Sequence, residues 1–278
     1  MNAVTMPTTW PAALSAYSDH LRARGLALST VRLYRRELQT LAGRCPDSGP
    51  WDLDGRDLCR WLTEHAPATQ RSYRKAAAGF YGWAVREGMT GQDPTRNVPR
   101  FPELPPRPRP VREADYAAAL ALAPTSRDRL LVRLAGDLGL RCAEVAAVHV
   151  DDLHDEVDGW WLTVQGKGAK VRALPLSDEL ADELRAAGRR CGGWVFPNRT
   201  GGHLTSPHVG RVISRLLPPG YTAHKLRHRF ATRAYGLERD VCAVQDLLGH
   251  SRPATTAVYV QTTTSSMRTT LEALERAR

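Results

Sequence analysis

The amino-terminal part of the chain carries a helical pattern of apolar and polar positions. From Trp10 to about Gly88, apolar residues recur three and four apart, the spacing that places side chains on one face of an α-helix. Ser29 and Asp54, two residues suited to capping a helix, precede two of the apolar runs. The pattern predicts four helices, at residues 11–24, 30–42, 55–65 and 68–87.

The last of these helices has a basic face beside its apolar stripe. The stripe consists of Ala77, Phe80, Tyr81 and Val85, and the basic side chains are Arg71, Arg74, Lys75 and Arg86. Such a face can lie on the phosphates of a nucleic acid or can simply be solvated, and the helix alone favours neither interpretation.

A proline-rich stretch, VPRFPELPPRPRP, follows at residues 98–110. Its prolines exclude a helix or a central strand and favour an extended, semi-rigid connector. We therefore predict a helical domain at residues 1–98, a linker at 99–110 and a second domain at 111–278. Arg100, Arg107 and Arg109 suit a linker that follows a DNA backbone from one domain to the next.

The second part mixes helices with a few strands. The patterns predict helices at 113–123 and 126–138, a short helix starting near Cys142, and helices at 207–217, 225–235, 241–248 and 265–278. The runs GWWLTVQ (159–165) and VRALPL (171–176) flank GKGAK (166–170), whose glycines suit the turn of a β-hairpin, and WVFP (194–197) predicts another short strand. The expected fold is mainly α with a small antiparallel β-sheet, which is an α+β domain behind a four-helix domain.

Charge and composition narrow the class of partner. The 278 residues carry a formal net charge of +10 and a pI near 9.8, which favours a polyanion such as nucleic acid. No apolar run approaches the length of a membrane span and the start lacks the order of a signal peptide, so we expect no membrane partner and a cytoplasmic location. The five cysteines are scattered and lack metal-ligand spacing, and we expect reduced, mostly buried thiols.

Two short segments offer candidate residues that are weak when taken alone. GLRCAEV (139–145) places Arg141 one helical turn before Glu144, although such a pair is usually an ordinary ion pair. Lys167 stands at the tip of the expected hairpin, where a long side chain can reach a ligand, but hairpin lysines are usually solvated and Lys170 competes for any role.

AHKLRHRFAT (223–232) is a stronger candidate for an anion site. On a helix, His224 and Arg227 lie within one turn of each other and can converge on a single anion. His224 and His228 also have the spacing of a helical zinc site, but Lys225 stands where a metalloprotease has glutamate. The neighbouring cations favour phosphate over a metal ion, so we expect neither a metal nor a cofactor.

The segment LLGHSRPATTAVYVQ (247–261) places Tyr259 nine residues after His250. A tyrosine between two valines is most often a core residue. The nine-residue spacing between His250 and Tyr259 indicates a function only when it is considered together with the other segments.

In this order, the segments resemble the tyrosine recombinase family, which includes the phage integrases and the Xer-type recombinases. The family pattern is an arginine in a GLR turn, a lysine on a β-hairpin, HxLRH, LGH, and a tyrosine nine residues beyond that histidine. Every position is filled here, by Arg141, Lys167, His224, Arg227, His250 and Tyr259. The resemblance is strong over residues 138–261, and the amino-terminal part matches only as a small basic helical domain.

The resemblance implies a site-specific recombinase that cleaves and rejoins DNA through a covalent 3′-phosphotyrosine, without a metal. Tyr259 would be the nucleophile, His224 its base and Lys167 the acid that protonates the leaving 5′-oxygen. Arg141, Arg227 and His250 would bind the non-bridging phosphate oxygens, the electrostatic contribution that usually dominates such barriers. Glu144 and His228 would orient these groups rather than contact phosphate.

The family also implies double-stranded DNA with specific recombination sites as partner, a clamp of two domains around it, and a homotetramer or a set with a paired recombinase. The terminal segment can dock on a neighbouring subunit through Leu271 and Leu274 or pack on its own domain. Two alternatives remain: a type IB topoisomerase, which shares the chemistry, and a non-catalytic DNA-binding relative.

Overall fold

The computed structural model describes residues 7–101, 109–166, 170–189, 192–238 and 240–249. The chain divides into two compact units, Met1–Leu104 and Pro105–Arg278, and the division falls within the expected linker at 99–110. Among the described residues, no helix is long and apolar enough to cross a membrane.

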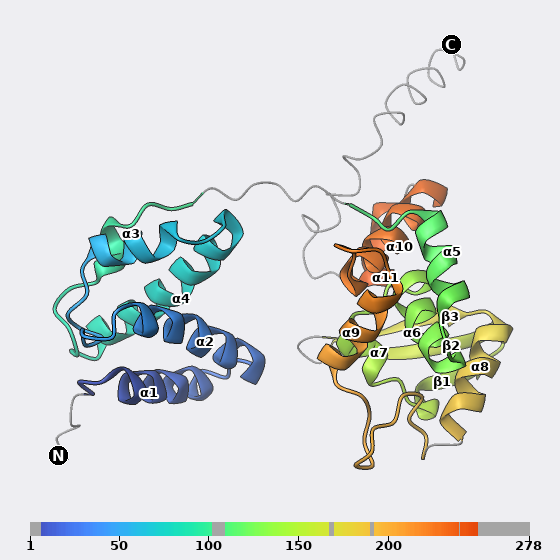
Figure 1. Cartoon of the computed structure of the whole chain (residues 1–278). Coiled ribbons are helices and arrows are strands. Elements are labelled where there is room, and N and C mark those ends of the chain that lie inside the picture. The colour runs from blue at the N-terminus through green and yellow to red at the C-terminus, as the bar shows by residue number, and fades with distance from the viewer. Residues whose placement is uncertain (1–6, 102–108, 167–169, 190–191, 239, 250–278) are drawn as a thin grey trace, which may run out of the picture. The chain divides into compact units, whose positions relative to one another are not determined.

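The first unit is helical, and its four main helices lie where the periodicity predicts them (Figure 1). They are α1 (Trp10–Ala23), α2 (Leu28–Arg44), α3 (Gly55–Thr63) and α4 (Pro67–Arg86), followed by the 3₁₀ turn η1 (Pro94–Asn97). Asp54 caps α3 as expected, because its carboxylate accepts hydrogen bonds from the backbone N–H groups of Arg56 and Asp57. Ser29 does not cap α2: the helix begins at Leu28, two residues before the expected start, with Ala27 as its N-cap.

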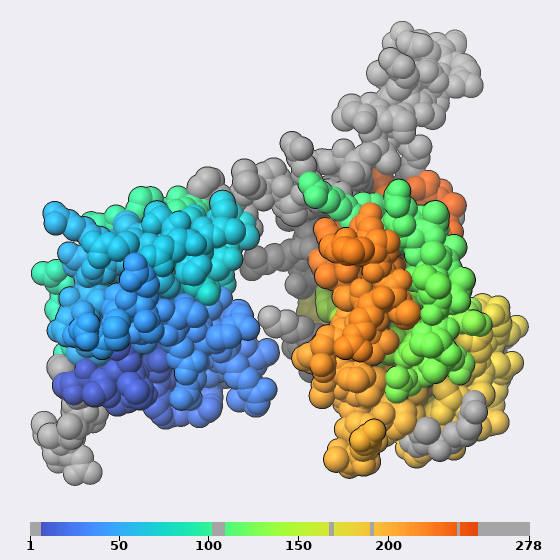
Figure 2. Space-filling model, viewed as in Figure 1, coloured from blue at the N-terminus to red at the C-terminus, as the bar shows by residue number. Residues whose placement is uncertain are grey.

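Aromatic side chains form the centre of this unit. Phe80 of α4 is fully buried and stacks with Trp10 and Trp51 at ring-centroid distances of 5.9 and 5.4 Å. The space-filling view shows the outer surfaces of the helices that enclose this core (Figure 2). One residue of the expected basic face turns back onto its own chain, because Arg74 donates hydrogen bonds to the carbonyl of Val98.

The second unit is built on a three-stranded antiparallel sheet in the order β1-β2-β3. The strands are β1 (Leu153–Glu156), β2 (Gly159–Gln165) and β3 (Val171–Leu176). The hairpin of β2 and β3 has the expected bounds, whereas β1 is an addition to the prediction. Residues 194–197 are not a strand: Trp194 and Pro197 make only isolated bridges, to His149 and His203, and the intervening residues enter the core instead.

Helices surround this sheet. They are α5 (Glu113–Leu122), α6 (Ser126–Asp137), α7 (Cys142–Ala146), α8 (Asp178–Arg189), α9 (Ser206–Leu216), α10 (Ala223–Glu238) and α11 (Val241–Leu248), with a 3₁₀ turn, η2 (Val150–Asp152), before β1. Helix α8, which the sequence analysis did not expect, lies beside the sheet (Figure 1). The helix expected at 265–278 lies outside the described residues.

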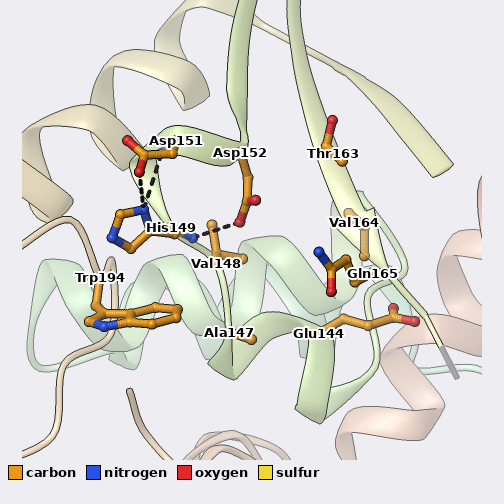
Figure 3. A pocket seen from close by; sticks show the side chains of 10 residues that line it. All are labelled: Glu144, Ala147, Val148, His149, Asp151, Asp152, Thr163, Val164, Gln165 and Trp194. Atoms are coloured by element: carbon orange, nitrogen blue, oxygen red, sulfur yellow. Dashed lines mark hydrogen bonds and ion pairs between the residues drawn. The ribbon is translucent and has the colours of Figure 1, made fainter. Parts of the chain in front are cut away.

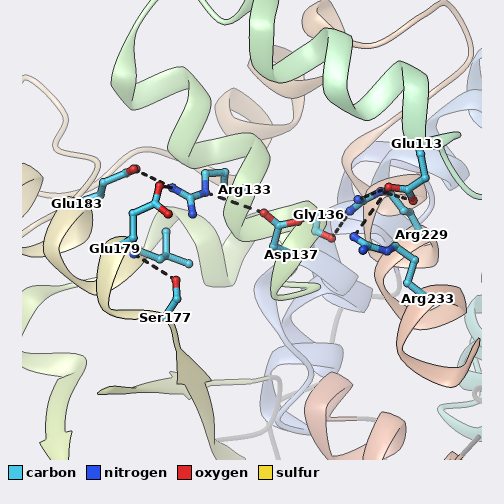
Figure 4. Close-up of polar contacts among 10 residues, drawn as sticks. Glu113, Arg133, Gly136, Asp137, Ser177, Glu179, Glu183, Arg229 and Arg233 are labelled. Carbon is cyan, nitrogen blue, oxygen red and sulfur yellow. Dashed lines mark hydrogen bonds and ion pairs between the residues drawn. The ribbon is translucent and has the colours of Figure 1, made fainter. Parts of the chain in front are cut away.

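Ion pairs tie the helices of the second unit together (Figure 4). Arg229 of α10 is 2% exposed, donates to both carboxylate oxygens of Glu113 on α5, and lies 3.6 Å above the ring of Tyr116. Arg133 of α6 pairs with Glu183 of α8 at 2.8 Å. Helix α10 is thereby fixed against α5, and α6 against α8.

Four of the five cysteines lie among the described residues, and all four are free thiols. Cys45, Cys59 and Cys142 are half-buried and Cys242 is exposed, so the expectation of mostly buried thiols is wrong for this part of the chain. Cys242 faces solvent because α11 turns Val244 and Leu248 to the core instead.

Candidate active site

The turn between α6 and α7 presents Arg141. Gly139 has φ of 63°, and a Cβ atom there would lie 2.5 Å from Cδ1 of Phe230, so this position requires both the backbone freedom and the small size of glycine. Leu140 is buried, and Arg141 stands as the N-cap of α7 with 39% of its side chain exposed. The turn thus packs tightly against α10 and leaves the Arg141 side chain accessible.

Glu144 is the centre of the polar contacts at this turn. Its side chain is 3% exposed and accepts a hydrogen bond of 2.9 Å from the backbone N–H of Arg141 and one of 2.7 Å from Nη1 of the same residue. Nη1 of Arg227 lies 3.9 Å from Oε2 of Glu144. One buried carboxylate therefore pairs with two of the arginines that are expected to bind phosphate.

The environment keeps Glu144 ionised. Burial alone raises the pKa of this carboxyl group, but hydrogen bonds from Arg172 and from the backbone and side chain of Arg141 outweigh burial, and the pKa lies below its usual value. The carboxylate can therefore hold these guanidinium groups across the neutral pH range.

Arg227 is anchored to two backbone carbonyl groups. The residue is 2% exposed, and its guanidinium group donates hydrogen bonds to the carbonyls of Gly139 and Leu248. The first carbonyl belongs to the turn before α7 and the second to the last residue of α11. Arg227 thus connects three segments that are far apart in the sequence.

His224 and His228 lie one turn apart on α10, with their rings edge to face at a centroid distance of 4.5 Å. Partial burial of the His224 ring, and then the charges of Arg227, Lys225 and Arg141, lower the pKa of this residue. Burial and the neighbouring His224 lower the pKa of His228 to about 4. Both rings are therefore favoured in the neutral form, in which His224 can accept a proton.

Arg172 of β3 is a member of this cluster that the sequence analysis did not single out. Its Nη2 lies 2.8 Å from Oε2 of Glu144, its Nη1 3.2 Å from Oε1, and its Nε donates to the carbonyl of Leu247 at 3.0 Å. The sequence contained a signal for it: Arg172 and Leu174 are two residues apart and share one face of β3, and Leu174 is 1% exposed. An arginine on the buried side of a strand needs a partner.

Lys167, His250 and Tyr259 lie outside the described residues. The residues on both sides of the hairpin tip that holds Lys167 are described, as is Gly249 before His250. The base of the hairpin is closed by a 2.7 Å hydrogen bond from the N–H of Gly166 to the carbonyl of Lys170, and a Cβ atom on Gly166 would lie 3.8 Å from Oε1 of Glu144. Gly249, which ends α11 with φ of 61°, would place a Cβ atom 3.1 Å from Nη1 of Arg172. Both flanking glycines therefore adjoin the arginine cluster.

Two pockets border this cluster. A pocket of about 400 Å³ has Glu144 and Gln165 at one end and His149 and Trp194 at the other (Figure 3). A second, of about 560 Å³, is lined by residues that include His224 of α10 and two exposed arginines of α9, Arg211 and Arg215. The second pocket thus places His224 beside two exposed arginines, an arrangement that suits an extended polyanion.

The comparison with known proteins agrees with the geometry. Residues 111–266 match the model of the phage integrase family. The chain belongs to the phage integrase family. Its members are tyrosine recombinases, enzymes that cleave and rejoin DNA at specific sites, and the chain is accordingly a site-specific recombinase.

Two relatives illustrate the extent of the similarity to other tyrosine recombinases. The chain is 33% identical over 270 residues to tyrosine recombinase XerC of Xanthomonas campestris pv. campestris, covering 89% of this chain and 83% of that protein. It is 30% identical over 290 residues to tyrosine recombinase XerD of Ralstonia nicotianae, covering 95% and 94%.

Solved structures share the fold of this recombinase. XerH bound to a palindromic difH substrate, in a post-cleavage complex, aligns with a TM-score of 0.73 at 20% identity over 96% of this chain and 85% of XerH. A lambda integrase dimer bound to a COC′ core site aligns with a TM-score of 0.73 at 20% identity over 89% and 76%. These likenesses confirm the predicted fold class, a mainly helical protein with a small antiparallel sheet.

Proposed function

We propose that this recombinase cuts DNA by attack of the Tyr259 hydroxyl on a phosphodiester, giving a 3′-phosphotyrosine and a free 5′-hydroxyl. The other catalytic residues in this proposal are Arg141, Lys167, His224, Arg227 and His250. The observation that carries the proposal is the cluster around Glu144. This one carboxylate meets three arginines, Arg141, Arg172 and Arg227, so the cluster retains an excess of positive charge.

The excess charge is what phosphoryl transfer requires of this site. Negative charge accumulates on the non-bridging oxygens of the pentacoordinate phosphorus, and fixed guanidinium donors stabilise it without reorganisation. Arg141, 39% of whose side chain is exposed, presents N–H groups to a bound phosphate. Arg227 contributes from a fixed, buried position.

His224 supplies the base in this scheme. Its lowered pKa favours the neutral ring at physiological pH, so the ring can take the phenolic proton of Tyr259, whose hydroxyl ordinarily has a pKa near 10. Lys167 then gives a proton to the leaving 5′-oxygen, and His250 adds a hydrogen bond to the phosphate. Rejoining runs the same steps in reverse with a 5′-hydroxyl of the partner strand.

The partner we propose is double-stranded DNA carrying specific recombination sites. The net charge of +10 and the exposed Arg211 and Arg215 beside His224 support this partner. We also propose a homotetramer on DNA, or an assembly with a paired recombinase, acting in the cytoplasm. A solved lambda integrase tetramer bound to a Holliday junction, with a TM-score of 0.71, supports the four-subunit assembly.

A suicide substrate tests the proposal. A duplex carrying the recombination site, nicked close to the cut position, releases a short fragment after cleavage and traps the covalent adduct. The wild-type protein should accumulate an adduct that denaturing electrophoresis detects, and Tyr259→Phe should form none while binding the same duplex.

The adduct should also be mapped to its residue by mass spectrometry. An adduct that persists in Tyr259→Phe overturns the assignment of the nucleophile, and its absence from the wild-type protein on a duplex that undergoes recombination in cells overturns the mechanism. Relaxation of supercoiled DNA without strand exchange would instead identify a type IB topoisomerase.

A further inference from the structure

The side chain of Arg172 links strand β3 to helices α7 and α11 in the second unit. It lies on β3, its fork holds both carboxylate oxygens of Glu144 on α7, and its Nε donates to the carbonyl of Leu247 near the end of α11. Only 11% of the side chain is exposed. Each of its three nitrogen atoms thus has a protein acceptor, and through these contacts Arg172 holds Glu144 and the end of α11 in place.

The hydrogen bond to Leu247 stabilises the C-terminal end of α11. The last carbonyl groups of an α-helix lack partners within the helix, and the negative end of the helix dipole favours a nearby cation. Two guanidinium groups occupy this end of α11, because Arg172 binds the carbonyl of Leu247 and Arg227 binds that of Leu248. The residues that follow in the sequence are Gly249 and His250.

The bonds to Glu144 fix the orientation of the carboxylate. Glu144 accepts from Arg172 through both oxygens, while the same two oxygens face Arg141 and Arg227. Planar pairing between a guanidinium group and a carboxylate sets the direction of both groups, which a lysine, as a point charge, does not do.

We propose that Arg172 is a positioning residue of the recombinase, which aims Glu144 at Arg141 and Arg227 and fastens the end of α11 from which the chain leads to His250 and Tyr259. The proposal rests on the function proposed above. It assigns to β3, the second strand of the hairpin, a role in positioning both the Glu144 cluster and the end of α11.

Arg172→Lys tests this role, with Arg133→Lys as the matched control. Arg133 lies in the same unit, has 16% of its side chain exposed, and pairs with carboxylates other than Glu144, namely those of Asp137, Glu179 and Glu183 (Figure 4). Both variants keep the charge and lose the fork, so a difference between them reports what the fork of Arg172 does.

The measurements are single-turnover cleavage of the suicide duplex at saturating protein, affinity for the intact duplex, and the melting temperature. Arg172→Lys should slow cleavage about 10- to 100-fold, the usual effect of removing a group that orients an active-site ligand, with little change in affinity. Arg133→Lys should leave both the cleavage rate and the affinity unchanged.

Two results would overturn the proposal: wild-type cleavage by Arg172→Lys, or an equal slowing of both lysine variants in step with their melting temperatures. These outcomes are distinct from failure of the proposed function, which would show as a missing adduct in the wild-type protein. A double-mutant cycle with Glu144→Gln, measured below the melting temperatures of all the variants, adds a second test: if Arg172 acts through Glu144, the Arg172→Lys change should slow cleavage less in the Glu144→Gln background than in the wild type.

Discussion

The guanidinium group of Arg227 donates a hydrogen bond to the carbonyl of Leu248, the last residue of α11. A side chain proposed to bind phosphate therefore also completes the end of the helix that precedes His250. The same group binds the carbonyl of Gly139 in the turn that presents Arg141. We therefore expect both folding and catalysis to depend on Arg227.

Replacing Arg227 and replacing Arg141 should have different effects on stability but similar effects on cleavage. Both Arg227→Lys and Arg141→Lys should lower single-turnover cleavage on the order of 10²- to 10³-fold, since each removes fork donors to the transition state. Only Arg227→Lys should also lower the melting temperature markedly, because Arg227 is 2% exposed whereas 39% of the Arg141 side chain is exposed. Equal melting temperatures for the two variants would contradict a structural role for the buried arginine.

Neutralising Glu144 should destabilise the second unit. Glu144→Gln leaves the buried Arg172 without its charged partner, and breaking a buried pair in this way costs about 3–5 kcal/mol. The control is Glu179→Gln, whose side chain is 74% exposed beside Arg133, where about 0–1 kcal/mol is expected. Urea unfolding of both variants measures the difference, and a loss at Glu144 no larger than at Glu179 would refute the central role of this carboxylate.

His228 should make the protein less stable in acid. Its pKa is about 4 in the folded protein and near 6.5 in an unfolded chain, so between these values the unfolded state binds more protons. Stability from this residue therefore falls as the pH drops from about 6.5 to about 4. Melting temperatures measured across this range should fall less steeply for His228→Gln than for the wild type. The control, His154→Gln at an exposed position, should retain the wild-type slope.

The lowered pKa of His224 should be visible in the cleavage rate. If neutral His224 is the base, wild-type cleavage should persist below pH 6.5 and decline only as the ring becomes protonated. His224→Gln should cleave about 10²- to 10⁴-fold more slowly and lose this part of the pH dependence, as single-turnover rates across the range would reveal. An unchanged profile in His224→Gln would assign the base to another group.

Periodicity predicted most of the fold because most helices have one buried and one exposed face. It failed where packing rather than pattern decides the structure. Strand β1, LHDE, has one half-buried residue followed by three exposed ones and exists through pairing with β2. Residues 194–197 look like a strand, but Val195 and Phe196 enter the core from a loop. Helix α8 buries Leu180, Ala181, Leu184 and Gly188, a face with only two large apolar side chains, and its pattern was not recognised in the sequence.

For the site, motif order and spacing predicted Arg141, His224 and Arg227, which the structure relates through Glu144 and α10. The role of Arg172 did not follow from any motif, because its partners lie 28 and 75 residues away along the chain. Only its place on the buried side of β3 marked it. Contacts between distant segments are decided by the fold, and a local pattern carries no direct record of them.

The backbone anchors of Arg227, together with the partners of Glu144, all belong to one unit, Pro105–Arg278. The described residues of the proposed active site and the groups that hold them therefore all lie in the second unit. We expect chimeras that replace Met1–Leu104 with the corresponding unit of a relative to keep this arrangement intact, which would make the second unit a starting point for recombinases directed to new DNA sequences.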